Sequence, residues 1–455
     1  MSLCLSCVTV GCIEHLQDHF ETSGHKFAVS MEFGHIFCAS CKDFVYDRKT
    51  EKIRREAENN FRKRLGLCLK NEWNPSSSES KILQTGSQMF YLDRGTIRGL
   101  RGLVNLGNTC FMNCIIQSLI HIPHLRDYFL TDQHICRYQL NGNNSDPSNL
   151  CLMCELANIF QEFYSGQSDP FVPQRMLHLV WKHAEHLAGY GISLNNYVHI
   201  HMFAEQHDAH EFLISALNVL HKHSESNSIK SNPNECRCII DRLFTGRLQS
   251  DLTCMRCGRV STTVDPFWDI SLELVSNSGG QYIERTLEDC LANYVKCETL
   301  ELPVIKCDRC GTYVTATKQL SLKTLPMIAC FHLKRFEHTV FNKRKKIHSV
   351  VRFPEQIDLT PYTTAYCKKL KLNGTACKED SAVDLLNRSS NKYELISVVN
   401  HHGSTESGHY SCFIRHYMEQ WYRCNDQHIA NEVLESVLAS EGYLLFYVKS
   451  FIDYD

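Results

Sequence analysis

The chain has 455 residues, of which 43% are hydrophobic and 22% are charged. These proportions are typical of a globular protein, and a chain of this length usually forms more than one domain. The formal net charge of -2 argues against general electrostatic binding to nucleic acid. No apolar run reaches transmembrane length, and the first residues do not begin a signal peptide. We therefore expect a nuclear or cytosolic protein, in which most of the 24 cysteines are reduced and serve metal binding or catalysis.

Closely spaced cysteines and histidines fill the beginning of the chain. Thiolate and imidazole groups at such spacing are typical of zinc sites. We expect a small zinc module over residues 1–60, with its ligands drawn from Cys4, Cys7, Cys12, His15, His19, His25, Cys38 and Cys41. The cluster starts almost at Met1, so we expect the module to be truncated at its front and short of a ligand.

A charged helix and a linker are predicted over residues 61–98. Acidic and basic residues alternate from about residue 47 to residue 69, which favours a solvated helix over a nucleic-acid-binding arm. The polar, turn-rich stretch 74–80 follows and is typical of a linker. A large domain is expected to span residues 99–449.

Cys110 lies where a loop rich in glycine and asparagine passes into an apolar helix. A helix N-terminus carries partial positive charge, and we expect it to favour the thiolate of Cys110. Asn105 is on the same loop, at a position where its amide is a candidate donor to an oxyanion. The local pattern alone also fits a buried structural cysteine in a turn.

Three further groups of cysteines have zinc spacing. The strongest consists of two knuckles, each followed by a glycine, and predicts a zinc ribbon at the tip of a β projection, the fingers, over about residues 236–325. A second group predicts a small zinc clip, although core cysteines around a loop are an alternative. The third is weak, because its fourth ligand is uncertain and Asp241 is the nearest candidate. The ligands are Cys254, Cys257, Cys307 and Cys310 in the ribbon, His134, Cys136, Cys151 and Cys154 in the clip, and His221, Cys236 and Cys238 in the weak group.

The last third of the chain is rich in predicted strands and carries a second set of candidate catalytic residues. His409 stands beside a glycine at the start of a strand, and Asn425 and Asp426 follow the next strand. A catalytic cysteine needs a base within hydrogen-bond reach and a third group that orients the base. Cys110, His409 and either Asn425 or Asp426 supply these roles in the chain order of papain-like proteases.

Six segments together resemble the conserved boxes of the ubiquitin-specific proteases, and they extend over nearly all of residues 99–449. The segments are Asn105–Asn113, Gln206–Phe212, Asp265–Ile270, His332–Phe336, Ser407–Tyr410 and Gly442–Tyr447. The resemblance implies an α+β, papain-like right-hand fold of thumb, zinc-ribbon fingers and β palm. Within this family the chain is most similar to the subgroup that works in the SAGA transcriptional coactivator.

The resemblance also implies roles for individual residues. Cys110 matches the nucleophile, His409 the base and Asn105 the oxyanion residue, while Asn425, with Asp426 beside it, matches the third member. Substrate contacts are implied for Asp208, Tyr410 and Phe336. The implied activity is removal of ubiquitin from lysine side chains, with nucleosomal core histones as substrates. The implied setting is the nucleus, with structural zinc and with the adaptor subunits of the SAGA deubiquitinase module as partners.

One departure from the family leaves alternatives open. Residues Gly191–Ala204 look like an insertion just before the Asp208 segment, where they would obstruct the channel for the ubiquitin tail. A ubiquitin-binding pseudoenzyme is therefore one alternative function. A zinc-dependent chromatin or nucleic-acid reader is another, although the balanced charge argues against it.

Overall fold

The chain divides into two compact units, Met1–Tyr91 and Leu92–Asp455. The structure is a computed structural model. It describes residues 2–7, 9–30, 36–40, 43–45, 99–131, 133, 134, 136, 151–183, 207–224, 236, 238–274, 284–338, 344–372, 391–404, 408–416 and 420–450, with scattered positions between 49 and 60. The predicted linker, Cys41 and the segment Gly191–Ala204 lie outside the described residues. None of the described helices is long and apolar enough to cross a lipid bilayer.

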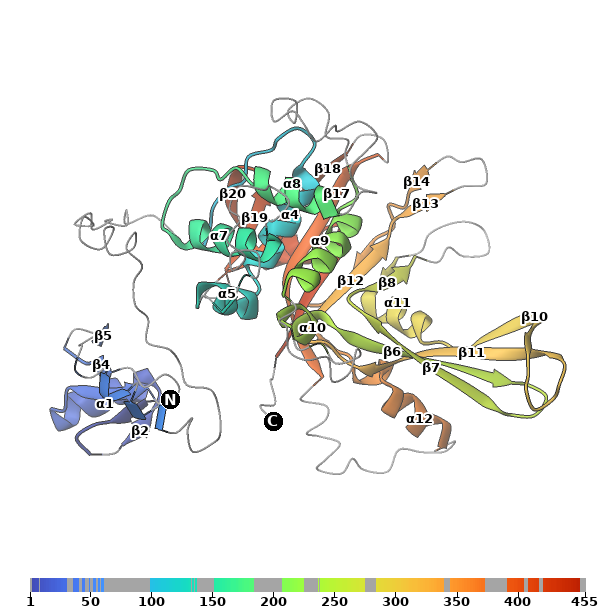
Figure 1. The fold of residues 1–455 in the computed structure, drawn as a ribbon, viewed down its shortest axis with the longest axis horizontal. Helices are drawn as coiled ribbons and strands as arrows, with labels where there is room; N and C mark the ends of the chain where they lie inside the picture. The colour runs from blue at the N-terminus through green and yellow to red at the C-terminus, as the bar shows by residue number, and fades with distance from the viewer. Residues whose placement is uncertain are drawn as a thin grey trace. The chain divides into compact units, whose positions relative to one another are not determined.

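The N-terminal unit contains a small sheet and the helix α1, with further helical residues between positions 49 and 60 (Figure 1). Its strands are β1 (Ser2–Cys4), β2 (Val10–Gly11), β3 (Phe27–Ser30), β4 (Ile36–Cys38) and β5 (Asp43–Val45), in the order β2-β1-β3-β4-β5, and its helix is α1 (Ile13–Ser23). The core is a cluster of only five buried residues, among them Leu16 and Phe20 of the helix. So small a core rarely stabilises a fold alone, and metal ligation is the usual supplement.

Six helices of the second unit form its helical layer. They are α4 (Cys110–Ile120), α5 (Pro123–Leu130), α7 (Leu152–Tyr164), α8 (Gln174–His183), α9 (Ala209–Ser224) and α10 (Ile239–Phe244). Every residue of α4 is buried, since this helix lies between other helices and the main sheet. Cys110 is its first residue, as the apolar periodicity after that position predicts.

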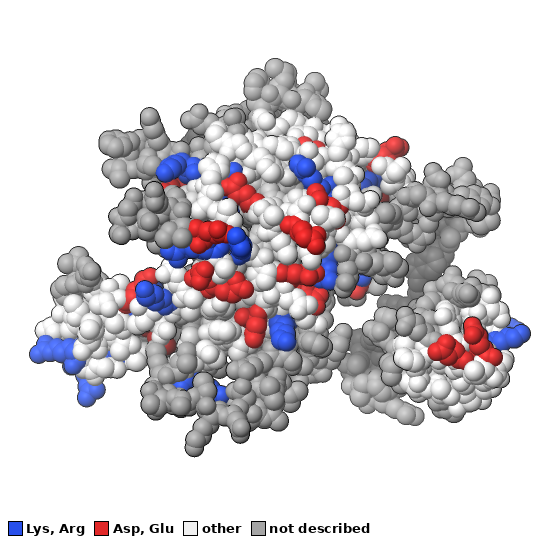
Figure 2. All heavy atoms as spheres, turned by 180° about the vertical axis from the view of Figure 1, so that it is seen from behind, with Lys and Arg blue, Asp and Glu red and all other residues white. Residues whose placement is uncertain are grey.

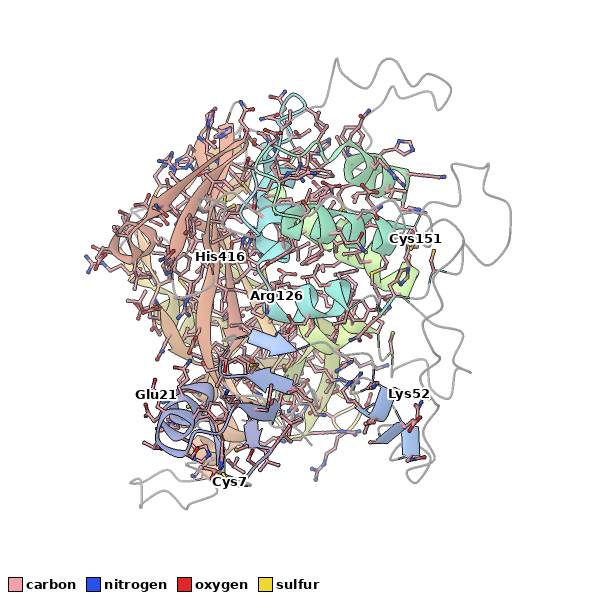
Figure 3. The ribbon with its side chains drawn as sticks, turned by 90° about the vertical axis from the view of Figure 1, so that its left-hand side faces the viewer. Cys7, Glu21, Lys52, Arg126, Cys151 and His416 are labelled. Atoms are coloured by element: carbon pink, nitrogen blue, oxygen red, sulfur yellow. The ribbon has the colours of Figure 1, made fainter. Side chains whose placement is uncertain are left out.

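An eight-stranded sheet, the palm, forms the other layer, and Figure 3 shows its orange and red strands beside the green and cyan helices. Its strands run in the order β20-β19-β18-β17-β21-β12-β8, with β16 paired to β17. Their bounds are β8 (Ile270–Glu273), β12 (Ile328–Lys334), β16 (Gln356–Asp358), β17 (Lys392–Gly403), β18 (Gly408–Arg415), β19 (Trp421–Asn425), β20 (His428–Glu432) and β21 (Gly442–Lys449).

The two faces of the palm pack against different cores. Along β21, Leu444 and Phe446 belong to the core shared with the helices, whereas Leu445 and Tyr447 belong to the core on the opposite face. This alternation follows from the two-residue period of a strand. Of the smaller elements, α11 (Leu287–Tyr294), β15 (Val351–Arg352), η3 (Thr360–Tyr362) and α14 (Leu434–Leu438) contribute to the second core. The others are β9 (Arg285–Thr286), β13 (Phe336–His338), β14 (Arg344–Lys346) and α12 (Thr364–Leu372).

Four long antiparallel strands form the fingers. They are β6 (Gly246–Cys254), β7 (Val260–Phe267), β10 (Glu298–Lys306) and β11 (Tyr313–Thr324), in the order β10-β11-β6-β7. Most side chains of β7 are exposed, and only Cys254, Cys307 and Val314 form a buried cluster near the tip. The tip therefore has almost no apolar core of its own.

The loop before α4 is held against the turn between β19 and β20. The Leu103 N–H donates to the Asp426 carbonyl at 2.9 Å. A Cβ added at Gly102 would collide with the backbone of Gln427, so the loop and the turn approach as closely as a glycine permits. This approach brings the residues just before Cys110 next to Asn425 and Asp426.

We predict that Gly102→Ala disturbs this approach. The extra methyl group meets backbone atoms, so the loop or the turn has to move, and overpacking of this kind destabilises by about 1–3 kcal/mol. The melting temperature should fall, and activity should fall further than the loss of folded protein explains. The control is Gly24→Ala, which adds only backbone strain because the space around its Cβ is open. Unchanged melting and activity in Gly102→Ala would contradict the prediction.

Candidate active site and zinc sites

Cys110 is the first residue of α4 and is only 2% exposed. The Tyr410 N–H donates to its sulfur at 3.4 Å, which places the thiol at the start of β18. Burial raises the pKa of the Cys110 thiol above its ordinary value; the Tyr410 N–H opposes this rise, and the negative charge of Asp426 adds to it. The N–H groups of Cys110 and Phe111 at the start of the helix lower this pKa, as the sequence predicts, but burial has the larger effect. A thiol with a raised pKa gives up its proton only when a base lies close to it.

His409 lies beside Tyr410 on β18 and is oriented by the neighbouring strand. Its Nε2 is 2.6 Å from Oδ1 of Asn425, the last residue of β19. A carbonyl oxygen only accepts hydrogen bonds, so Nε2 carries the proton in the neutral ring. Nδ1 is then the basic nitrogen.

Asp426 follows Asn425 in the turn after β19 and has a positive φ of 50°. Its two carboxylate oxygens are held by two amides, Asn113 at 2.8 Å and Asn105 at 3.0 Å. One of these oxygens, Oδ2, is 3.9 Å from His409 Nε2. The sequence left Asn425 and Asp426 as alternatives; in the structure Asn425 makes the direct hydrogen bond to His409, and Asp426 brings a negative charge near the ring.

The side-chain amide of Asn105 is oriented from both ends. Its Oδ1 accepts the N–H groups of Gly107 at 3.0 Å and Thr109 at 3.1 Å, and its Nδ2 donates to Asp426. Gly107 and Asn108 have positive φ values of 91° and 55°, as expected from the Gly/Asn pattern of this loop. An amide nitrogen has two hydrogens, and the one that does not face Asp426 remains for another acceptor.

Asp208 stands at the N-terminus of α9, where its Oδ1 accepts the N–H of His210 at 2.7 Å. Its Oδ2 accepts the hydroxyl of Tyr443 at 2.6 Å. The rings of Phe336 and Tyr410 lie 5.3 and 6.1 Å from the Tyr443 ring, so the three predicted substrate-binding residues gather around one tyrosine. Tyr410 is only 3% exposed, so its ring is buried beside the ring of Tyr443.

Three residues of this region were not singled out from the sequence. Asn113, His332 and Tyr443 all lie within segments quoted for the family resemblance, but nothing in their local pattern shows that they join residues from distant segments. His332 Nε2 is 3.2 Å from the Tyr443 hydroxyl, and burial lowers the pKa of His332 to about 3, which keeps it neutral.

His210, Asp269 and His332 lie close enough together to suggest a metal site. The rings of His210 and His332 are stacked, 3.8 Å apart and inclined by only 17°. The lone pairs of nearly parallel rings point in parallel planes and do not converge on one ion. We therefore assign no metal to this group.

The knuckles of the fingers have the dimensions of a zinc site. Sulfur atoms each about 2.3 Å from a tetrahedral zinc are about 3.8 Å from one another. The Cys254–Cys310 and Cys257–Cys307 sulfur pairs are 3.9 and 3.6 Å apart. The four thiols that the sequence predicts as a ribbon thus fit a zinc ion.

Three further groups bring four donor atoms within 4.8 Å of one another. They are Cys4, Cys7, His19 and His25; His134, Cys136, Cys151 and Cys154; and His221, Cys236, Cys238 and Asp241. Figure 3 labels Cys7 in the N-terminal unit and Cys151 at the start of α7. The third group includes Asp241, the ligand about which the sequence was least certain.

The N-terminal group differs from the expectation in its membership. Its four donors make a full set, so the predicted lack of a ligand does not hold for this site. Cys12 and His15, at the start of α1, form a separate pair in which Cys12 Sγ lies 2.9 Å from His15 Nδ1. Neither residue belongs to the four-donor group. Cys38 is also outside the four-donor group, and Cys41 is not among the described residues.

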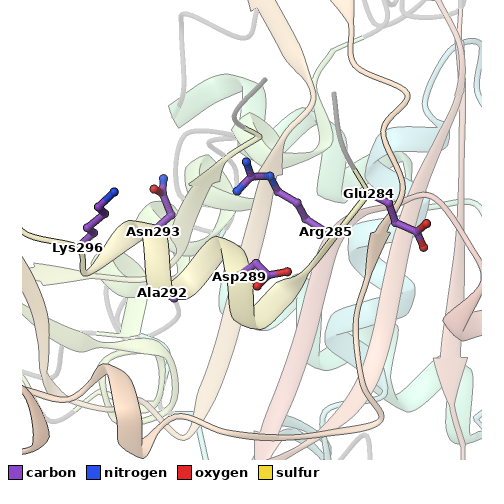
Figure 4. Close-up of a pocket in the computed structure, with 6 residues that line it drawn as sticks. All are labelled: Glu284, Arg285, Asp289, Ala292, Asn293 and Lys296. Atoms are coloured by element: carbon purple, nitrogen blue, oxygen red, sulfur yellow. The ribbon is translucent and has the colours of Figure 1, made fainter. Parts of the chain in front are cut away.

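The surface shows two further features. A hollow of about 420 Å³ beside α11 is lined by charged and polar residues of both signs, such as Arg285 and Asp289, and contains neither cysteine nor histidine (Figure 4). On the face seen in Figure 2, acidic and basic side chains are interspersed, without a large basic patch among the described residues.

The arrangement of a buried cysteine, a histidine and an asparagine on a helix-and-sheet scaffold agrees with a family match. The family model described as "Ubiquitin carboxyl-terminal hydrolase" matches residues 101–447. The chain belongs to the ubiquitin carboxyl-terminal hydrolase family. A second model, "Zn-finger in ubiquitin-hydrolases and other protein", matches residues 2–50. Members of this family are cysteine-type deubiquitinases, and the chain is one of them.

Similar proteins narrow the type. The chain is 45% identical to ubiquitin carboxyl-terminal hydrolase 22 of Homo sapiens, over 99% of this chain and 86% of the relative. It is 42% identical to ubiquitin carboxyl-terminal hydrolase 27 of Homo sapiens, over 91% of this chain and 97% of the relative. The chain is therefore a deubiquitinase of the ubiquitin carboxyl-terminal hydrolase 22 type, and this similarity confirms the subgroup predicted from the sequence.

Solved structures agree with the fold. A yeast SAGA deubiquitinase module has a TM-score of 0.65 at 26% identity, covering 99% of this chain and 87% of that one. A SAGA Ubp8/Sgf11/Sus1/Sgf73 module bound to ubiquitin aldehyde has a TM-score of 0.64 at 26% identity, with the same coverage. The predicted α+β fold with a zinc-finger module is confirmed. The zinc-finger match and the four-donor groups together indicate that this hydrolase binds zinc.

We predict that the zinc of the fingers is needed for folding. Structural zinc contributes on the order of 10 kcal/mol, and the tip has almost no apolar core to replace it. Cys307→Ala should lower the zinc content measured by mass spectrometry and cause the protein to aggregate on mild heating. The control is Cys297→Ala, which removes an exposed thiol of the same region that belongs to none of the donor groups. Equal zinc content and equal melting in both variants would refute the prediction.

Proposed function

We propose that the protein removes ubiquitin from lysine side chains by nucleophilic catalysis, with Cys110, His409, Asn425, Asp426 and Asn105 as its catalytic residues. The observation that carries the proposal is the convergence of two distant segments, in which Tyr410 bonds to the sulfur of Cys110 while His409, the residue before it, bonds to Asn425. A nucleophile, a base and a group that orients the base thus lie at one place.

The geometry supports the following steps. His409 Nδ1 takes the proton of the Cys110 thiol, and the sulfur attacks the carbonyl carbon of the last glycine of ubiquitin. The carbonyl oxygen becomes an oxyanion beside the free Asn105 N–H and the Cys110 N–H. His409 then gives its proton to the departing lysine amine, the carbon–nitrogen bond breaks, and a thioester remains. Water, activated by His409, hydrolyses the thioester and frees Cys110.

Asn425 and Asp426 contribute differently to this scheme. Asn425 holds the ring of His409 in one orientation by a 2.6 Å hydrogen bond, but an amide stabilises imidazolium less than a carboxylate does. Asp426 supplies the missing charge from 3.9 Å. The same charge raises the pKa of the Cys110 thiol. Asp426 therefore opposes ionisation of the thiol itself, while it favours the protonated form of the nearby His409 ring that accepts the proton.

Asp208 and Phe336 are proposed to bind the C-terminal tail of ubiquitin. The tail is basic, and Asp208 offers it a carboxylate whose position is set by Tyr443. The aromatic ring of Phe336, which is partly exposed, provides an apolar wall beside it. Tyr410 is proposed to support this wall and to position Cys110 through its backbone.

We further propose nuclear action on ubiquitinated nucleosomal histones within a SAGA-type module, with zinc structural at all four donor groups. Support comes from the similar structures, which are described as SAGA modules of Ubp8 with Sgf11, Sus1 and Sgf73. The zinc-finger match at residues 2–50 adds to it, because this module is the expected docking site for adaptor subunits. The full set of ligands at Cys4, Cys7, His19 and His25 favours a folded module.

Replacement of the nucleophile tests the mechanism. Cys110→Ala should lower the turnover of a ubiquitin–fluorophore substrate by at least about 10³-fold, since the whole nucleophilic pathway depends on this sulfur. Ubiquitin binding should persist. A ubiquitin with a C-terminal electrophile should form an adduct at Cys110 in the unaltered protein, as mapped by mass spectrometry.

Cys114→Ala is the matched control for this test. Cys114 lies one turn further along α4 and is equally buried, at 2% exposed, but packs against Cys412 inside the core. Most activity should remain in this variant. An adduct at another cysteine, or equal loss of activity in both variants, would contradict the assignment.

The histone proposal is tested on nucleosomes that carry ubiquitinated histones. The full chain should release ubiquitin slowly by itself and several-fold faster when the adaptor subunits are added, since such subunits hold the catalytic unit in a productive shape. Ubiquitin–fluorophore turnover by the same samples is the control for general activity. Good turnover of the small substrate without any release from nucleosomes, with or without adaptors, would reject the histone role and leave the deubiquitinase activity intact.

A further inference from the structure

Asn113 connects the helix of the nucleophile to the carboxylate beside the base. It lies on α4 three positions after Cys110 and is 2% exposed. Its Nδ2 donates to Asp426 Oδ1 at 2.8 Å and lies 3.4 Å from the Val104 carbonyl. We propose that Asn113 is a positioning residue of the active site, which acts through Asp426 on the oxyanion donor Asn105. This inference rests on the proposed function.

The first step of the argument concerns the carboxylate. Asn113 holds one oxygen of Asp426 and Asn105 holds the other. With both oxygens engaged, the carboxylate has a single orientation about its last bond. Without Asn113, the described contacts of the carboxylate would be those of Oδ2 alone, the hydrogen bond from Asn105 and the approach of His409 Nε2 at 3.9 Å, and Oδ1 would lose its amide donor.

The second step concerns Asn105, which is exposed at the mouth of the site. Its Oδ1 accepts hydrogen bonds from its own loop, and one of the two hydrogens on its Nδ2 forms a hydrogen bond with the carboxylate of Asp426. The position of Asp426 therefore fixes the plane of the amide and the direction of the second hydrogen. A rotated carboxylate would pull this hydrogen away from the developing oxyanion, where a preorganised donor is worth about 10²–10³ in kcat.

The alternative is that Asn113 only packs in the core. Its Oδ1 is buried and has no hydrogen-bond partner among the described residues, but the same holds for Oε1 of Gln117 on the same helix, so the unpaired oxygen does not separate the two readings. The hydrogen bond from Asn113 to Asp426 is what distinguishes Asn113. The two readings predict different kinetics.

Gln117 provides a matched control on the same helix. It lies one turn after Asn113, is 1% exposed, and donates its Nε2 to the Arg101 carbonyl at 2.7 Å. Its Oε1 is likewise buried without a partner in the described part of the chain. None of the described hydrogen bonds of Gln117 goes to a proposed catalytic residue, so Gln117→Ala reports the cost of removing a buried amide from α4, together with any movement of the loop at Arg101.

The first experiment is a double-mutant cycle in the full-length protein with a ubiquitin–fluorophore substrate. Asn113→Ala should lower kcat roughly 10- to 100-fold with little change in KM. Gln117→Ala should retain most of the kcat of the unaltered protein, although its melting temperature should fall by about as much as that of Asn113→Ala. In an Asn105→Ala background, Asn113→Ala should have almost no further effect, since both act through one donor. Additive losses, or equal losses in Asn113→Ala and Gln117→Ala, would overturn the proposal.

The second experiment uses pH and does not depend on the folding of the alanine variant. Asn113→Asp places a second carboxyl group against Asp426, and two carboxylates at such a distance share a proton because the pKa of one is raised. At acid pH the shared proton preserves the contact; as pH rises through that raised pKa, the two charges repel and Asp426 turns away. The variant should therefore lose kcat at a pH where the unaltered protein keeps it.

A pH profile of Asn113→Asp that runs parallel to that of the unaltered protein would also overturn the proposal. Among the described residues, the titratable groups that interact with Asp426 are His409, at 3.9 Å, and the thiols of Cys110, Cys114 and Cys412. All of them are present in the two proteins compared, so the difference between the profiles isolates position 113. If the unaltered protein itself shows no turnover and no adduct with the electrophilic ubiquitin, the proposed function fails, a result distinct from either outcome for Asn113.

Discussion

The packing of α4 against β18 is the contact on which the active site depends. It joins Cys110 to a strand residue 300 positions away in the chain, and it buries every side chain of the helix. Each part of the site is placed from one side of this contact. The loop before α4 supplies Asn105, β18 supplies His409, and the turn after β19 supplies Asn425 and Asp426. A shift of α4 relative to the sheet would therefore separate the nucleophile from its base.

The same contact explains the chemistry of the cysteine. Burial between a helix and a sheet removes water from the thiol and raises its pKa, and this effect is larger than the opposing effect of the N–H groups at the start of the helix. The position of the base relative to the sulfur therefore matters for the ionisation of Cys110. The site thus combines a protected nucleophile with a network of amides that positions the charged Asp426.

The fingers are built on a different principle. Their strands project from the palm with largely exposed side chains, so hydrophobic burial cannot hold the tip together. Four thiols at the distances of a tetrahedral zinc site replace the missing core. The described residues of the N-terminal unit form a core of five buried side chains, and a four-donor group that fits a zinc ion lies in the same unit.

Local patterns determined much of this structure in advance. The loop-to-helix change at Cys110, the knuckles of the fingers and the strands around His409 depend on residues close together in the chain, whose spacing is visible without a fold. The grouping of Cys254 and Cys257 with Cys307 and Cys310 was predicted for the same reason, since each half is complete in itself. The resemblance of six segments to one family supplied the order in which these parts assemble.

Only the tertiary structure decided the rest, because it depends on contacts across hundreds of residues and on burial. The different roles of Asn425 and Asp426 follow from their contacts. Asn425 forms the hydrogen bond with His409, whereas Asp426 accepts hydrogen bonds from the amides of Asn105 and Asn113. The raised pKa of Cys110 follows from the layers that enclose it. Asp241 joins His221 and Cys238 only because α9 and α10 pack together. None of these relations has a local signature, since the same residues at the same spacing could face water in another fold.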